Sequence, residues 1–229
     1  MRIKLLSLLV VIGHIPLHAQ VDPRQTGAWY MYFWSTQFQQ SPWGLQGDVQ
    51  YRNWNLFGDL EQLLLRGGLS YTPANTELRL TLGYAHIVSG AFGASTETTR
   101  EHRIYQEASL PQQIGKRLYL RHRFRYEQRF VQSQDFRTRY RYALFLTLPL
   151  FRKEIQKGTW YLSLYNEVFL NGQKDIGNGR TVEIFDANRL YGALGYVLTP
   201  RLRVQMGYMQ QTKNNYSKGQ IQLSIHSKF

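Results

Sequence analysis

The chain has 229 residues, a formal net charge of +13, 14% aromatic residues and no cysteine. This length allows one domain, and so many aromatic side chains argue against a disordered chain. The lack of cysteine excludes disulfide frameworks, thiolate zinc sites and cysteine nucleophiles, and the negative mean hydropathy excludes a bundle of transmembrane helices.

The first nineteen residues have the pattern of a secretory leader. Arg2 and Lys4 form a basic start, Leu5 to Leu17 is largely apolar, and Ala19 supplies a small residue at the exit. The apolar run is shorter than the ~20 residues that a membrane-spanning helix needs. The sequence therefore predicts a cleaved signal peptide at 1–19, followed by a single exported domain at 20–229.

From Gly27 onward, apolar and polar residues alternate with a period of two, which is typical of strands. The clearest example is 116–131, where leucine and aromatic residues occupy one face and arginines the other. Turn residues separate the strands that we expect. These strands number eleven: 27–38, 43–55, 61–72, 77–89, 98–110, 116–131, 135–150, 158–170, 184–198, 201–213 and 218–229.

The length of these segments favours a membrane barrel over a soluble sheet, whose strands are usually about 5–6 residues long. A lipocalin-like secreted barrel, with its apolar face inside, is the alternative. The chain ends as an alternating strand that closes on Phe229, which resembles the assembly signal of bacterial outer-membrane barrels. We therefore expect an all-β fold, an antiparallel up-and-down transmembrane β-barrel of about ten to twelve strands, in the cell outer membrane.

The strand count raises a difficulty, because bacterial outer-membrane barrels have an even number of strands. Either 27–38 lies outside the wall or within the bore, or a twelfth strand lies hidden in a long connection. The sequence leaves both possibilities open.

Short stretches throughout the chain resemble a family of Gram-negative outer-membrane barrels known as domain of unknown function 2490. The stretches are Gly27–Tyr30, Val49–Arg52, Leu64–Leu69, Glu101–Gln106, His122–Phe130, Arg139–Tyr142, Asn166–Glu167, Asn188–Tyr191 and Gly207–Met209. The resemblance implies an outer-membrane location and a barrel, and it implies no activity.

Arginines gather on one face of two successive predicted strands, where same-face neighbours are about 6.6 Å apart. At an effective dielectric of ~20, two such charges repel by about 2.5 kcal/mol. A ladder this dense needs anions, either carboxylates of the chain in a salt-bridged filling or small anions in a binding site or anion-selective pore. Carboxylates with matching parity include Asp48, and if the hairpin turns about Ser133, Glu127 faces Arg139. The candidate bore network is Arg117, Arg121, Arg123, Arg125, Glu127, Arg129, Arg137, Arg139, Arg141, Glu101, Glu107 and Glu167.

Catalytic motifs are weak. A lipid-modifying hydrolase of the outer membrane, the alternative function, needs a serine beside a histidine. The histidines beyond the predicted leader are His86, His102, His122 and His226, and no nucleophile-elbow, zinc-protease or calcium-loop motif is present. We therefore expect no enzyme activity, no metal and no cofactor, and a role that is structural or porin-like passage of small solutes or anions.

The predicted partners follow from location and charge. We expect outer-membrane lipids, the barrel assembly machinery acting through the strand that ends at Phe229, and small anions as a further ligand class. Net positive charge usually suggests nucleic acid, but here the arginines alternate along strands of an exported chain. We therefore expect no nucleic-acid partner.

Overall fold

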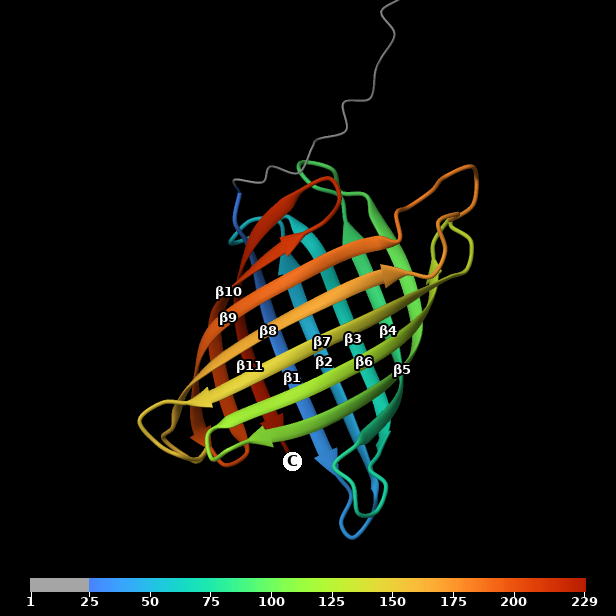
Figure 1. Ribbon diagram of the computed structural model, residues 1–229. Coiled ribbons are helices and arrows are strands. Elements are labelled where there is room, and N and C mark those ends of the chain that lie inside the picture. The colour runs from blue at the N-terminus through green and yellow to red at the C-terminus, as the bar shows by residue number, and fades with distance from the viewer. Residues whose placement is uncertain (1–24) are drawn as a thin grey trace, which may run out of the picture.

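The computed structural model describes residues 25–229, which form eleven β-strands in one closed barrel (Figure 1). The predicted signal peptide at 1–19 lies outside the described residues. The described residues contain no helix long and apolar enough to cross a membrane. The strands are β1 (Gly27–Gln37), β2 (Trp43–Asn53), β3 (Leu60–Tyr71), β4 (Arg79–Gly90), β5 (Thr98–Ile114), β6 (Leu118–Val131), β7 (Arg137–Pro149), β8 (Trp160–Asn171), β9 (Phe185–Thr199), β10 (Leu202–Thr212) and β11 (Ser217–Lys228).

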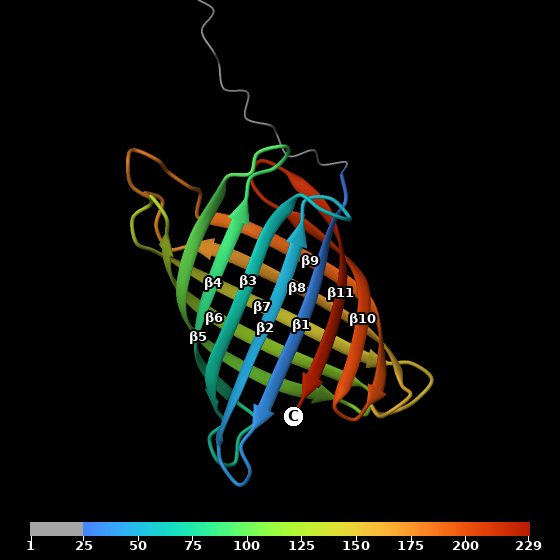
Figure 2. The same ribbon diagram turned by 180° about the vertical axis from the view of Figure 1, so that it is seen from behind.

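The prediction of an all-β barrel is confirmed, and each of the eleven predicted segments corresponds to one strand. Consecutive strands pair antiparallel around the wall, and β1 closes the barrel by pairing parallel with β11. This closing pair runs from Gly27 opposite Gln220 to Ser35 opposite Lys228. Figure 2 shows the two strands side by side, β1 in blue and β11 in red.

Neither way of reaching an even strand number applies to this chain. β1 is part of the wall, neither outside it nor in the bore, and the strands form a closed order without a twelfth. Up-and-down strands alternate in direction, so an odd number leaves the first and the last strand pointing the same way. A parallel pair is therefore the one closure open to eleven strands, and the sequence pattern of single strands does not reveal it.

The two ends of the barrel differ. β11 ends at the C-terminal mouth, together with the links 38–42, 72–78, 115–117, 150–159 and 200–201 (Figure 1). β1 begins at the opposite end, which carries the links 54–59, 91–97, 132–136, 172–184 and 213–216.

Pro111 lies within β5, which continues past residue 110, where we expected this strand to end. β5 pairs with β6 as far as Ile114, whereas its pairing with β4 stops at Ser109. Beyond Ser109, β5 has a free edge on the β4 side. A proline is tolerated there because no partner on that edge requires its missing N–H.

The β6–β7 hairpin turns about Ser133, which was the condition for pairing Glu127 with Arg139. Ser133 has a φ of 59°, and the amide of Gln134 donates to the carbonyl of Val131 at 3.1 Å. This turn sets the register of the hairpin and places Glu127 opposite Arg139.

The apolar face of the wall points outward and the charged face points inward. Leu190 on β9 is 60% exposed and Met206 on β10 is 61% exposed, whereas Glu127 on β6 is 1% exposed. Residues of one parity along each strand share a face, so this contrast extends around the barrel. A lipocalin-like arrangement, with the apolar face inside, is therefore excluded.

Two glycines on the inner wall let tyrosine rings lie flat against it. Gly83 pairs with Tyr105, and Gly195 pairs with Tyr161. A Cβ at Gly83 would meet the Tyr105 ring at 2.2 Å, and one at Gly195 would meet the Tyr161 ring at 2.3 Å. Both rings therefore occupy the space over the backbone that a larger residue would fill.

Candidate functional site

Six side chains from β5 to β8 form a ring of alternating charge inside the barrel. Glu127 contacts Arg141 at 2.6 Å, and Arg141 contacts Glu167 at 2.7 Å. Glu167 contacts Arg123 at 2.6 Å, and Arg123 lies 3.7 Å from Glu107. Glu107 contacts Arg125 at 2.5 Å, and Arg125 lies 3.9 Å from Glu127, which closes the ring. We call these six residues the charge ring.

Glu127 is the hub of the charge ring because two further branches meet there. On one side, Arg139 contacts Glu127 at 2.6 Å and Asp186 at 2.8 Å. On the other side, Arg103 lies 3.6 Å from Glu127 and contacts Glu101 at 2.6 Å.

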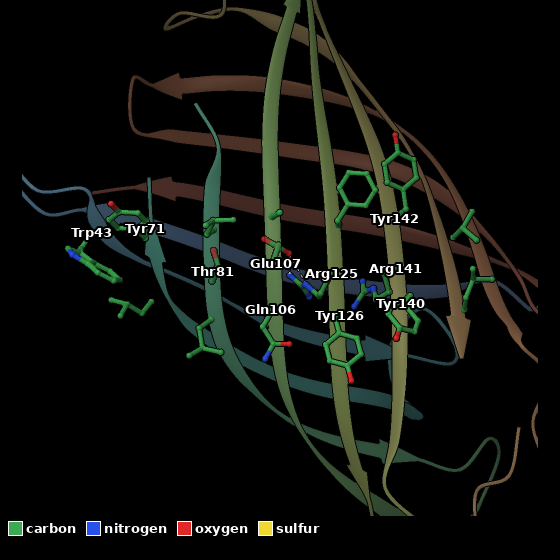
Figure 3. A pocket seen from close by; sticks show the side chains of 17 residues that line it. Trp43, Tyr71, Thr81, Gln106, Glu107, Arg125, Tyr126, Tyr140, Arg141 and Tyr142 are labelled. Carbon is green, nitrogen blue, oxygen red and sulfur yellow. Dashed lines mark hydrogen bonds and ion pairs between the residues drawn. The ribbon is translucent and has the colours of Figure 1, made fainter. Parts of the chain in front are cut away.

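Arg129 extends the second branch with a contact to Glu101 at 2.5 Å. The ring and its branches together hold six arginines and five carboxylates of the described residues. Nearly every buried positive charge here is therefore balanced by a buried negative one. Figure 3 shows three ring members, Glu107, Arg125 and Arg141, gathered from three neighbouring strands.

Two arginines next to the charge ring have no carboxylate within 4.0 Å among the described residues, and aromatic faces and amides hold them instead. The guanidinium of Arg52 lies 3.8 Å from the ring centre of Trp29, and that of Arg189 lies 4.8 Å from it. Arg52 also donates to the side-chain carbonyl of Gln50 at 2.6 Å, and Arg189 donates to that of Gln211 at 2.7 Å. Cation–π contacts and neutral hydrogen-bond acceptors thus stabilise these two charges inside the wall.

Between the charge ring and the end of the barrel opposite the C-terminal mouth, side chains fill the bore. Trp29 is 2% exposed, Phe169 1%, Gln211 1% and Gln220 0%. Side chains around a water-filled channel would be accessible to solvent. The burial of these residues therefore shows that this half of the bore is closed by packing.

A cavity of about 1570 Å³ lies between the charge ring and the C-terminal mouth, and we call it the vestibule. It begins at Trp29, Arg52 and Arg189 and reaches links of the C-terminal mouth such as 72–78 and 150–159. Thirteen arginines and lysines of the described residues line the vestibule, against five carboxylates. The barrel therefore has a filled half and an open half, and the open half is strongly cationic.

The structure places the twelve predicted site residues in three groups. Nine of them are in the charge ring or its branches: Glu101, Glu107, Arg123, Arg125, Glu127, Arg129, Arg139, Arg141 and Glu167. Arg121 and Arg137 face the bore but have no carboxylate within 4.0 Å among the described residues. Arg117 lies in the turn before β6, where it donates to the carbonyl of Pro149 at 2.8 Å.

Four members of the bore were not predicted from the sequence. Arg103 has the same parity as Glu101, so the alternation of β5 could have revealed it. Asp186 lies beside an irregularity of register between β8 and β9, which breaks the simple alternation. Arg52 and Arg189 meet at Trp29 only because β1 closes the barrel, and no local pattern reports that contact.

The histidines lie on both faces. His102 hydrogen-bonds the hydroxyl of Tyr84 and lies 4.9 Å from the ring of His86, and His122 hydrogen-bonds the hydroxyl of Tyr142 at 2.9 Å. These groups are on the outer face. His226 is inside the vestibule, 2.9 Å from the hydroxyl of Ser224. No group of three or more His, Asp or Glu side chains within residues 25–229 is arranged to hold a metal ion.

The outer wall has a hollow of about 800 Å³ over β2 to β8, lined by apolar and aromatic side chains such as Trp43, Leu82, Phe124 and Leu170 (Figure 3). Its surface is continuous with the apolar exterior of the wall.

The fold and the bore define a class of protein: a closed β-barrel with an apolar exterior and a charged interior. The chain belongs to the family described as "Protein of unknown function (DUF2490)", which it matches over residues 26–222. No curated protein and no solved structure matches the chain.

Proposed function

We propose that this protein is an integral barrel of the bacterial outer membrane, exported by a cleaved leader, with a bore that is closed at mid-height and a structural, non-catalytic role. The observation that carries this proposal is the polarity of the wall. Leucine, phenylalanine and tyrosine side chains are exposed on the outside, and arginine and glutamate side chains are buried inside. In water this arrangement would expose a wide apolar surface, whereas in a bilayer it would face lipid.

Two details of the outer wall support contact with lipid. Aromatic pairs lie near the strand ends, with Trp43 beside Tyr71 at 4.8 Å and Trp160 beside Tyr196 at 4.7 Å between ring centres. Such pairs fit the aromatic girdles of membrane barrels. Polar side chains on the outer wall also bond to each other, as Asn166 donates to Asn188 at 3.0 Å.

The ends of the barrel support an orientation with the C-terminal mouth toward the periplasm. The amide of Phe229 donates to the carbonyl of Ser35 at 2.9 Å, so the last residue joins the seam with β1. Its side chain stays 66% exposed. An exposed aromatic residue at the end of a paired strand is available to the assembly machinery, the partner we propose for this end.

The first test is fractionation. We expect the protein to remain with outer membranes after washing with alkaline carbonate, because lipid-facing side chains surround the whole wall. We also expect it to migrate differently on denaturing gels before and after boiling. Recovery in the soluble periplasmic fraction would contradict the proposal.

The variant that lacks Phe229 extends the same test. If the last residue guides assembly, deleting it should lower the folded, gel-shifted fraction in the membrane. Phe57→Ala is the matched control and should leave that fraction unchanged. Phe57 is 90% exposed and lies at the end of the barrel opposite the C-terminal mouth. Normal assembly of the truncated chain would remove the role given to Phe229.

A lipid-modifying hydrolase has less support than a structural barrel. The outer-face histidines that contact lipid in this proposal bond to tyrosine hydroxyls rather than to serine. The pair of Ser224 and His226 lies inside the vestibule, and no carboxylate of the described residues lies within 4.0 Å of His226 to orient its ring.

Passage of small anions is the second candidate function. The cationic vestibule favours it, since oppositely charged solutes would concentrate there. The filled half of the bore opposes it, because an ion would have to displace the charge ring and the side chains packed above it.

A further inference from the structure

We propose that the vestibule is a binding site for an organic anion that carries several negative charges. The site is formed by Arg79, Arg121 and Arg203, on β4, β6 and β10, and its ligand enters through the C-terminal mouth. This inference rests on the inner surface of the barrel and holds whichever membrane surrounds the wall.

Among the described residues, Arg79, Arg121 and Arg203 lack the carboxylate partners that the arginines of the charge ring have. No carboxylate lies within 4.0 Å of Arg79, Arg121 or Arg203 among the described residues. The Nε of Arg79 is buried and has no hydrogen-bond partner in the described part of the chain. A buried guanidinium nitrogen without an acceptor is unfavourable, and an anionic ligand would supply the missing acceptor.

The three positive charges act on one region of the vestibule. Arg123, Glu107 and Arg79, in this order of effect, are among the charged groups that act on Arg121. Arg121 and Arg203 both act on His226, which lines the same cavity. Like charges held near each other within a wall of low dielectric produce a strong field for anions.

The placement of the arginines favours a ligand with several negative charges. β6 and β10 are separated by three strands in the closed order, so Arg121 and Arg203 approach the cavity from different sides. A small monovalent ion brings a single negative charge to these two guanidinium groups. A ligand with several anionic groups would contact both, and each contact would be a charge-assisted hydrogen bond.

The size and the aromatic lining of the vestibule favour an organic ligand. The vestibule of about 1570 Å³ exceeds the ~300–1,000 Å³ of typical small-molecule sites. Phe33 and Phe145 also line it, and the guanidinium of Arg121 lies 4.0 Å from the ring centre of Phe145. Aromatic faces beside arginines accommodate a flat organic anion better than a bare inorganic ion.

The experiment uses the folded full-length barrel in nonionic detergent and the trianionic dye 8-hydroxypyrene-1,3,6-trisulfonate as the probe. We expect saturable binding by fluorescence anisotropy at low salt, weakening as salt is added. Tripolyphosphate should displace the dye at much lower concentrations than orthophosphate. Equal displacement by the two would overturn the requirement for several charges, and the absence of saturable binding would overturn the site.

The matched variants separate this site from the general positive charge of the chain. The double variant Arg121→Gln, Arg203→Gln should weaken dye binding by about tenfold or more, because the loss of one charge-assisted hydrogen bond lowers the affinity by about tenfold. Arg100→Gln removes an exposed charge at the opposite end of the barrel and should change binding by less than about twofold. Equal weakening by Arg100→Gln would contradict the proposal.

The gel shift on heating checks that each variant folds. Arg203→Gln alone is the second variant. We expect it to fold, because Arg203 is exposed to the vestibule and has no carboxylate partner among the described residues. Unchanged dye binding by a folded Arg203→Gln variant would also contradict the site.

Discussion

Replacing the hub of the charge ring, Glu127→Gln, is expected to destabilise the barrel by about 3–5 kcal/mol. Glu127 is 1% exposed and contacts Arg139 and Arg141, each at 2.6 Å. Glutamine keeps the size of the side chain but removes its charge. Two buried guanidinium groups would then lose their closest counter-ion, and the neighbouring arginines would repel each other. We expect a lower denaturant midpoint for unfolding, followed by tryptophan fluorescence.

Glu183→Gln is the matched control for this prediction. Glu183 pairs with Lys174 at 3.6 Å, and the two side chains are 67% and 63% exposed. Solvent screens such a pair, so its loss should change the free energy of unfolding by no more than about 1 kcal/mol. Equal midpoints for wild-type protein and Glu127→Gln would show that the charge ring adds little to stability.

The parallel seam between β1 and β11 gives the second large expected effect. The chain has no cysteine, so a pair of introduced cysteines reports a single contact. Tyr32 and Ile225 are partners in the seam and both point outward. Adjacent strands are about 4.8 Å apart, within the range that a disulfide bridges. The variant Tyr32→Cys, Ile225→Cys should therefore form the disulfide almost completely on mild oxidation.

The control pair is Tyr32→Cys, Val204→Cys. Val204 is the partner of Ile225 on the far side of β11, so it lies two strand spacings, about 10 Å, from Tyr32. That separation exceeds what a disulfide spans, and no bond should form. A folded barrel in which Tyr32 and Ile225 fail to cross-link would place β1 outside the wall and would restore a ten-stranded barrel.

The strands were predictable because each one carries its own evidence. Residues 118–131 separate Leu118, Leu120 and Phe124 from Arg121, Arg123 and Arg125, and the alternation recurs with varying clarity in the other segments. One local contact across strands was also predictable: a turn at Ser133 fixes the distance along the chain from Glu127 to Arg139. Alternation and turn chemistry thus specify neighbouring strands.

The rest of the bore depends on contacts that no local pattern contains. The charge ring joins Glu107 on β5 to Glu167 on β8, so its formation requires the correct register at three successive pairings. The meeting of Arg52 and Arg189 at Trp29 requires closure of the whole barrel. The division into a filled half and a vestibule depends on how side chains from many strands share one volume, and a single sequence leaves that open.

The most direct test of a closed bore is the current through purified barrels in a planar lipid bilayer, with insertion verified by flotation with liposomes. Side chains such as Phe169 and Gln220, 1% and 0% exposed, fill the half above the charge ring. Ions that enter the vestibule should therefore find no continuous water path to the other side. We expect no steady current above that of the lipid alone. A steady, anion-selective current through the wild-type barrel would contradict the closed bore and would establish passage of anions in its place.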